Sequence, residues 1–144
     1  MAEKPEIKLV GIYFTKLLAE RNPDFKGKLE ILPGINISSI DKFKPDQSKQ
    51  ELLKVSFDMG IDYKEFGKIS VRGELFLSAD PKTFKEILSD WKDKNHSSDT
   101  QVAIMNLIMQ KASIKALLLE EEVGLPPHIN LPVLRPSKKE DSSK

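Results

Sequence analysis

The sequence predicts a single α+β domain, in which a four-stranded antiparallel sheet is packed by one short and one long C-terminal helix. Apolar and polar residues alternate through the first half of the chain, and helical patterns follow from Asp80-Pro81 onward. Strand patterns followed by helical patterns are typical of α+β folds. The chain has 144 residues, of which 39% are hydrophobic, so it can bury the core of one domain.

The clearest strand signal lies between residues 53 and 77. Apolar and polar residues alternate there, which is the period of a strand with one buried face. A three-residue loop of Glu65-Phe66-Gly67, with Gly67 in the left-handed backbone conformation, predicts a hairpin. The resulting register pairs Tyr63 with Ile69, Ile61 with Val71, Met59 with Gly73 and Phe57 with Leu75.

Two further strands are predicted upstream of this hairpin. Residues 7–21 are rich in β-branched and aromatic side chains, and their alternation breaks near Gly11, which indicates a β-bulge. Ile35, Ile37 and Ile40 indicate another strand after a Pro33-Gly34 turn. We therefore expect a four-strand meander.

Both helices carry capping signals. Asp80-Pro81 is a favourable start for the short helix, with Asp as N-cap and Pro at the first helical position. Ser98 and Gln101 resemble a capping box at the start of the long helix, predicted at about residues 99–122, and Gly124 ends it. The segment beyond contains four prolines, so we expect it to be extended.

The long helix has two apolar faces on a helical wheel. A helix that covers a sheet needs only one, so a second face indicates a partner surface, unless the short helix or the proline-rich segment covers it. We expect a homo-oligomer, a dimer or a tetramer, with Leu107, Ile108, Leu118 and Leu119 as interface candidates. The first face carries Ala103, Ile104, Leu107, Ile114 and Leu118, and the second carries Met105, Ile108, Met109, Ala112, Ala116 and Leu119.

The composition argues against several classes of function. With 23 basic and 22 acidic residues the net charge is +1, which is not the basic excess of a nucleic-acid binder. There are no cysteines and two histidines, His96 and His128, both interpreted as ordinary residues, so no metal site is expected. Without a phosphate-binding loop or catalytic residues we expect no cofactor and no enzyme. Glu120-Glu121-Glu122 are interpreted as a solvated or partner-facing patch.

The chain is expected to be cytoplasmic and not inserted in a membrane. The N-terminus, Met-Ala-Glu-Lys-Pro-Glu, lacks the apolar stretch of a signal peptide. The longest continuous apolar runs are shorter than a bilayer span, and the absence of cysteine fits a reducing compartment. Residues 1–6 and 137–144 are predicted to be disordered tails around a single domain of residues 7–136.

The order of elements resembles the SecB family of export chaperones. The resemblance rests on Ile12-Tyr13 with Thr15-Lys16, on the middle hairpin, and on the long helix running into Gly124-Leu125-Pro126 and Ile129-Asn130-Leu131-Pro132-Val133. It covers residues 7–136. Unlike SecB proteins, this chain has no predicted second helix after Pro136.

This resemblance implies a holdase, a chaperone that binds unfolded polypeptides without ATP and possibly serves protein export. It also implies assembly as a dimer of dimers with the helices between the sheets. Related members are chaperones of antitoxins, so a dedicated adaptor for one partner is an alternative. A small-ligand carrier or enzyme subunit, with a pocket between helix and sheet, is another. The candidate client-binding residues are Leu125, Ile129, Leu131, Val133, Leu134, Met105 and Met109.

Overall fold

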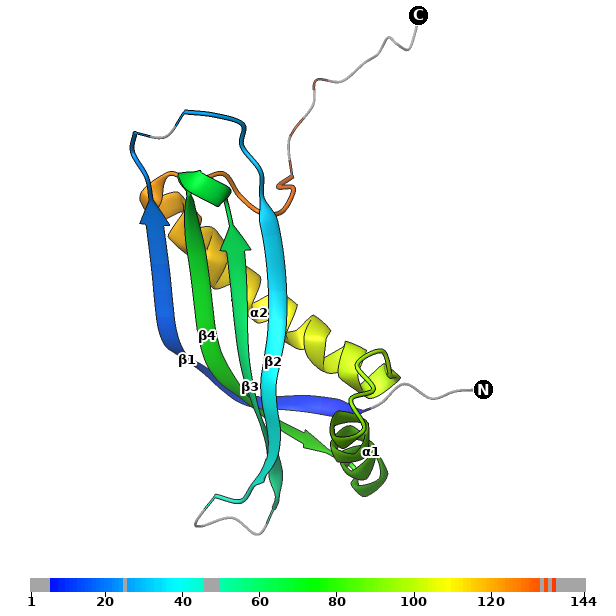
Figure 1. Cartoon of the computed structure of the whole chain (residues 1–144). Helices are drawn as coiled ribbons and strands as arrows, with labels where there is room; N and C mark the ends of the chain where they lie inside the picture. The colour runs from blue at the N-terminus through cyan, green and yellow to red at the C-terminus, as the bar shows by residue number, and fades with distance from the viewer. Residues whose placement is uncertain (1–5, 25, 46–49, 133, 135, 137–144) are drawn as a thin grey trace, which may run out of the picture.

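The structure, a computed structural model, describes residues 6–24, 26–45, 50–132, 134 and 136. It confirms the predicted fold class, a four-stranded antiparallel sheet followed by a short and a long helix (Figure 1). The predicted tails lie outside the described residues, apart from Glu6. The elements are β1 (Ile7–Arg21), β2 (Leu32–Phe43), β3 (Leu52–Asp62), the 3₁₀ helix η1 (Lys64–Phe66), β4 (Gly67–Ala79), α1 (Pro81–Lys92) and α2 (Asp99–Val123).

The strand order is β1-β4-β3-β2, so the prediction of a meander was wrong. The connection between β1 and β2 crosses the end of the sheet above the β3–β4 hairpin, which places β1 beside β4 (Figure 1). The backbone N–H of Asn22 donates to the carbonyl oxygen of Phe66 at 2.8 Å, which ties the start of this connection to the hairpin. β1 and β2 are therefore the two edge strands.

The predicted bulge in β1 is confirmed. The pairing of β1 with β4 shifts between Leu9 and Gly11, and it shifts again between Phe14 and Lys16. Each shift inserts one extra residue, which bends the strand and increases its twist. β1 can therefore follow the strongly curved end of the sheet over its full length.

The predicted register of the β3–β4 hairpin was wrong by two residues. Phe57 lies opposite Gly73, and Ile61 lies opposite Ile69. The loop is longer than three residues because η1 forms within it, and Lys64 adopts a left-handed φ of 59°. A shift of two residues leaves every side chain on its predicted face, since the side-chain period of a strand is two.

Pro33 and Gly34 lie inside β2 instead of forming a turn before it. They pair with Ile61 and Gly60 of β3. β2 is an edge strand, where a proline that lacks an N–H group is tolerated. The predicted strand is thus longer at its start than the isoleucine pattern indicated.

Both predicted N-cap residues are confirmed, but the Gln101 side chain donates to Ile87 and does not complete the predicted capping box. The Asp80 side chain accepts a hydrogen bond from the Thr83 backbone N–H at 3.1 Å, and Ser98 accepts one from the Gln101 N–H at 3.3 Å. Gly124 ends α2 with a left-handed φ of 72°, which glycine adopts without steric cost.

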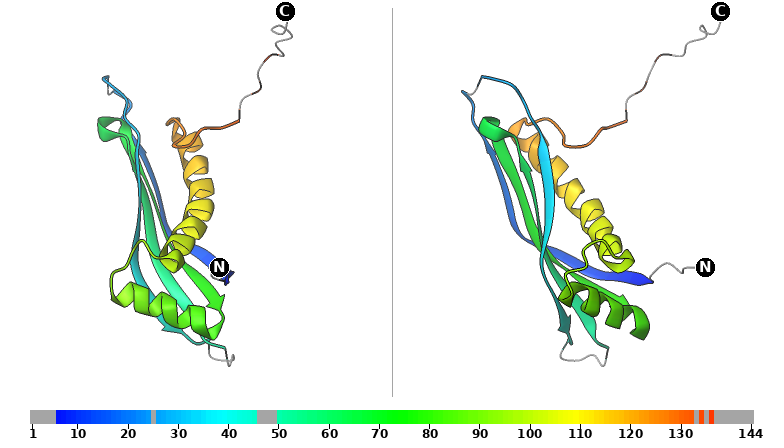
Figure 2. Two further views of the ribbon diagram at one scale, coloured as in Figure 1. Left: turned by 90° about the vertical axis from the view of Figure 1, so that its right-hand side faces the viewer. Right: turned by 45° about the vertical axis from the view of Figure 1, so that its right-hand side comes forward.

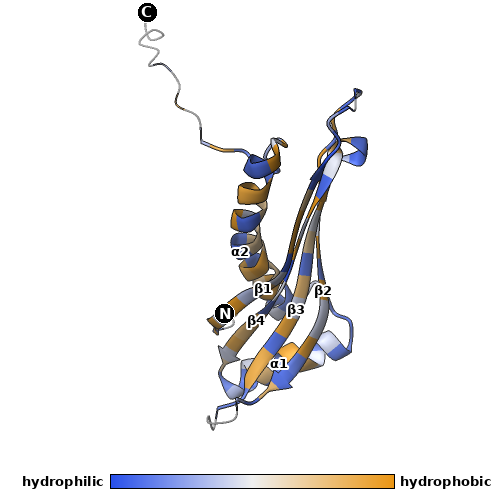
Figure 3. Cartoon of the chain, turned by 90° about the vertical axis from the view of Figure 1, so that its left-hand side faces the viewer, coloured by the Kyte–Doolittle hydropathy of each residue, from blue (hydrophilic) through white to orange (hydrophobic). Residues whose placement is uncertain are grey.

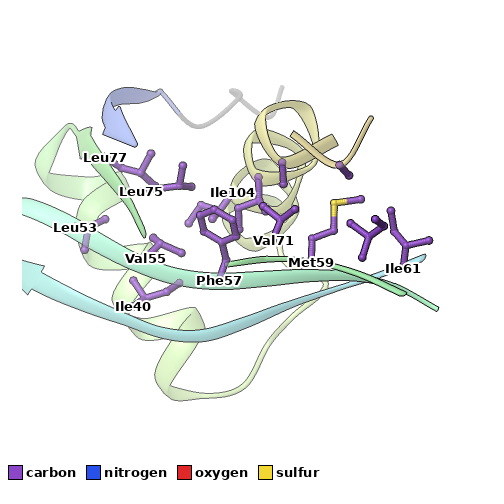
Figure 4. Packing of buried hydrophobic residues seen from close by; sticks show 14 of the residues in the cluster. Ile40, Leu53, Val55, Phe57, Met59, Ile61, Val71, Leu75, Leu77 and Ile104 are labelled. Carbon is purple, nitrogen blue, oxygen red and sulfur yellow. The ribbon is translucent and has the colours of Figure 1, made fainter. Parts of the chain in front are cut away.

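The core lies between the sheet and the helices. α2 runs along one face of the sheet, as the two views in Figure 2 show, and α1 packs at the end of that face through the fully buried Ile87. Ile104 of α2 packs with Phe57 and Val71 of the central strands (Figure 4). The odd-numbered residues from Leu53 to Ile61 on β3 are all buried, so the alternation in the sequence marks the true inner face.

Candidate functional site

The sheet-facing side of α2 winds around the helix. Its fully buried residues Ile104, Ile108, Ala112 and Ala116, with Glu120 beyond them, are spaced by four. At 3.6 residues per turn such a row drifts by about 40° per step. The row therefore starts on the first predicted apolar face and crosses onto the second, so neither face is wholly buried or wholly free.

Four large apolar residues of α2 remain exposed on its outer side. We call them the outer residues of α2, and their exposed fractions are 44% for Val102, 47% for Met109, 58% for Ile114 and 56% for Leu118. Figure 3 shows hydrophobic residues along much of the length of this helix. Single exposed apolar residues are ordinary, but several on one helix mark a surface that a partner can cover.

The candidate interface residues divide into three groups. Leu118 is exposed, whereas Leu107 and Leu119 are partly buried and pack against the core. Ile108 is fully buried by the sheet of its own chain. Ile108 is therefore not an interface residue, because the buried row of α2 drifts around the helix and turns this side chain toward the sheet.

The candidate client-binding residues divide in the same way. Ile129, Leu131 and Leu134 are exposed by 41%, 50% and 100%, so they lie free after the end of α2. Met109 is exposed and Met105 half-buried. Leu125 is a core residue, 5% exposed, and its selection was wrong, while Val133 lies outside the described residues.

A buried polar cluster fastens the segment after α2 to the domain. We call it the C-terminal latch, and it consists of Tyr63, Ser113, Glu120 and His128. The Tyr63 hydroxyl contacts the Glu120 carboxylate and lies 2.7 Å from the carbonyl oxygen of Pro126. His128 Nδ1 lies 3.0 Å from both carboxylate oxygens of Glu120, and Nε2 lies 3.2 Å from Ser113 Oγ. The chain is therefore held as far as His128, beyond which the exposed residues begin.

The latch is shielded from water. Glu120 and Tyr63 are 1% and 0% exposed, and the side chain of His128 is 2% exposed. Burial, and then the hydrogen bond with Glu120, raise the pKa of Tyr63 well above its usual value of 10.0. Arg21 adds an outer contact, since its guanidinium donates to the carbonyl oxygen of Gly124 at the C-terminus of α2, where positive charge is favourable.

The contacts that join Ser113 to His128 and His128 to Glu120 resemble those of a serine–histidine–carboxylate catalytic triad. The sequence pattern did not predict this arrangement. A serine hydrolase also needs free N–H donors for the developing oxyanion. Ser113 lies in the middle of α2, whose backbone N–H groups donate along the helix, and it is only 9% exposed. The arrangement therefore supports a structural role. Glu120, predicted to belong to a solvated or partner-facing patch, is instead buried at the end of the row that begins at Ile104.

No metal-binding cluster of three His, Asp or Glu side chains occurs within the described part of the chain. By length and composition alone, α2 could cross a membrane, with a mean hydropathy of 1.5. The core helix of a soluble protein passes the same test, and α2 packs on the sheet. That it does not insert in a membrane stays a prediction.

No family model and no curated protein matches the chain. Among solved structures, it is similar to the SecB-like chaperone Rv1957 of Mycobacterium tuberculosis, determined in complex with a ChAD peptide from the HigA1 antitoxin Rv1956. The two share 14% sequence identity, with a TM-score of 0.49 over 91% of this chain and 93% of that one.

Proposed function

We propose that this protein is an ATP-independent holdase, which binds apolar segments of unfolded polypeptides and assembles as a homo-oligomer. One observation carries the proposal. The outer residues of α2, together with Ile129, Leu131 and Leu134, provide apolar surface that the described part of the chain leaves exposed. Burial of apolar surface is non-directional, so such a surface can bind many sequences.

The exposed segment after the C-terminal latch has properties that favour binding of an unfolded client chain. It starts at His128, whose ring is buried, and contains Ile129, Leu131 and Leu134, which are 41% to 100% exposed. Prolines within it disfavour helix and remove backbone donors, so it can border a bound chain without folding into helix. Contact with apolar client residues gains roughly 25 cal/mol per Å² of apolar surface removed from water.

Assembly is expected to depend on the outer residues of α2. Changing Ile114 and Leu118 to glutamate should convert the wild-type oligomer to a monomer, because it places two charges in the apolar interface. The control changes two exposed lysines of α1, Lys82 and Lys85, to glutamate and should leave the oligomer intact. Size-exclusion chromatography with light scattering measures both, and a monomeric wild type at micromolar concentration contradicts the assembly.

Client binding is expected to depend on the exposed C-terminal residues. Changing Ile129, Leu131 and Leu134 to serine should weaken binding of an unfolded client at least about tenfold, which corresponds to about 1.4 kcal/mol. The fold should persist, because these side chains lie outside the core. Serine at Val10 and Leu17, exposed by 55% and 46% on β1, is the control and should change little.

Fluorescence anisotropy with labelled unfolded clients measures this affinity. Equal client affinity of the C-terminal triple variant and of wild type contradicts a role of Ile129, Leu131 and Leu134 in client binding. The range of clients distinguishes two kinds of chaperone. Binding of several unrelated unfolded chains is expected for a holdase, whereas binding of one chain alone identifies a dedicated adaptor.

A further inference from the structure

The C-terminal latch places one hydroxyl group between two oxygen acceptors. Tyr63 Oη contacts Glu120 Oε2, and it also lies 2.7 Å from the carbonyl oxygen of Pro126. A phenol has a single proton, so it can donate to only one of these oxygens. Two oxygen atoms at hydrogen-bond distance with no proton between them repel each other. A second proton is therefore needed, and it comes from Glu120, because the carbonyl group of Pro126 has none to give.

Two arrangements of protons leave the buried latch without net charge. In one, His128 is an imidazolium and Glu120 is a carboxylate, which takes the only proton of Tyr63. The carbonyl oxygen of Pro126 then faces the phenol oxygen without a proton between them. In the other, Glu120 is a neutral carboxylic acid that donates to Tyr63, and Tyr63 donates to Pro126. Both arrangements hold the same number of protons, so the hydrogen bonds decide between them.

The neutral arrangement gives every polar side chain of the latch a partner. The Nδ1–H of a neutral His128 ring donates to Glu120 at 3.0 Å, and Ser113 Oγ donates to His128 Nε2 at 3.2 Å. The donors follow one another in a single chain of Ser113, His128, Glu120 and Tyr63, which ends on the carbonyl oxygen of Pro126. The ion pair breaks this chain at its last link.

The surroundings of Glu120 also favour its neutral form. Its side chain is 1% exposed, and taking an ionised carboxylate out of water is costly. Within the described residues, no Lys or Arg side chain forms an ion pair with it. Arg21 of β1 donates to the carbonyl oxygen of Gly124 instead. Its neighbours on α2, Glu121 and Glu122, are exposed acidic residues, which disfavour a third negative charge.

We propose that Glu120 holds a proton at neutral pH, and that the C-terminal latch opens when this proton is lost. Once Glu120 is ionised, it takes the proton of Tyr63, and the carbonyl oxygen of Pro126 is left without a donor. The segment after α2 is then released, and the residues beyond His128 lose their fixed starting point. The latch is therefore a pH-sensitive device. Its effect on clients rests on the proposed function, whereas the proton on Glu120 does not.

Glutamine is the matched substitute for a protonated glutamate. Its amide nitrogen can donate to Tyr63 and its oxygen can accept from His128, without charge. Glu120→Gln should therefore keep the latch closed, with a folding equilibrium constant within about tenfold of wild type at pH 7. Breaking one side of a buried ion pair would instead lower this constant by more than about a hundredfold. Urea unfolding measures the difference, and a loss of that size overturns the proposal.

The proton count predicts how stability changes with pH. Above about pH 7 an unfolded chain has lost most of the protons of glutamate and histidine side chains. The folded protein keeps one of them on Glu120, so its folding equilibrium constant should fall by up to about tenfold per pH unit as the pH rises. Glu120→Gln should lack this dependence, and Glu121→Gln, at an exposed position, should retain it. The same pH dependence in wild type and Glu120→Gln overturns the proposal.

The ring of His128 distinguishes the two arrangements in the protein without any change at Glu120. We expect a neutral ring with its proton on Nδ1, whereas the ion pair requires an imidazolium. The ¹⁵N NMR signals of the ring nitrogens separate these forms, and His96→Gln removes the other histidine from the spectrum. An imidazolium at pH 7 in the folded protein overturns the proposal, even if Glu120→Gln fails to fold.

The effect on clients is tested with one labelled unfolded client as the pH rises from about 7 to about 9. Wild type should bind it several-fold more weakly at the higher pH, because a released segment must be ordered again on binding. Glu120→Gln should bind it equally at both, and equal changes in the two proteins overturn this regulation. If the protein protects no client while the ring of His128 is neutral and the pH dependence of stability requires Glu120, the proposed function fails and the proton assignment stands.

Discussion

Replacing Gly67 with valine is expected to destabilise the protein by more than about 3 kcal/mol, because two effects add. The backbone φ of Gly67 is +149°, which a β-branched residue rarely adopts. An added Cβ would also lie 3.0 Å from the Cα of Arg21 and well inside van der Waals contact distance of the Glu20 carbonyl oxygen. β1 would have to leave its pairing with β4 at this point.

Gly60 is the matched control for this prediction. It lies in the middle of β3, where the nearest atom to an added Cβ is a backbone oxygen 3.8 Å away. Gly60→Val should therefore fold normally, since valine also favours strands. Urea unfolding measures both free energies, and equal stabilities of the two variants contradict the close approach of β1 to the hairpin.

Replacing Tyr63 with phenylalanine is expected to lower stability by about 1–3 kcal/mol. The change removes only the hydroxyl, so the ring still fills its place in the core. The buried Glu120 carboxylate would keep His128 but lose the hydroxyl, and the carbonyl oxygen of Pro126 would lose its contact with the same hydroxyl. Tyr13→Phe is the control, because Tyr13 also contacts a glutamate, Glu74, but is 49% exposed, and we expect little change.

The latch also predicts how stability depends on alkaline pH. The folded-state pKa of Tyr63 is raised, so the neutral phenol is favoured in the folded protein. Its contribution is complete below the unfolded value of 10.0 and is lost as the pH rises further. In the Tyr13→Phe background the remaining tyrosine should not ionise until the protein unfolds. Ionisation near pH 10 without unfolding, seen in the ultraviolet spectrum, contradicts the buried latch.

Local sequence patterns predicted the helices and strands well, because the ends and irregularities of these elements depend on residues close by in the chain. The caps at Asp80 and Ser98, the bulge near Gly11 and the stop at Gly124 all follow from side chains within a few positions. The register of the hairpin does not, since η1 depends on Lys64 taking a left-handed conformation that its residue type does not favour. The strand order depends equally on a long crossing connection.

The latch could have been found only in part. Tyr63 and Glu120 are 57 positions apart, and no local pattern links them. The spacing along α2 does indicate that Glu120 is buried, because it lies four positions after Ala116 and so continues the row of Ile108, Ala112 and Ala116. A buried carboxylate requires a partner in the core. This requirement distinguishes Glu120 from Glu121 and Glu122, which are exposed.

Protection of an unfolded client tests the central claim most directly. The purified protein is mixed with a chemically unfolded client, without nucleotide, and light scattering follows aggregation. The account predicts that wild type suppresses aggregation at a few-fold molar excess, and that the variant with serine at Ile129, Leu131 and Leu134 protects much less. Aggregation of the client at the same rate with and without folded wild-type protein would contradict the account.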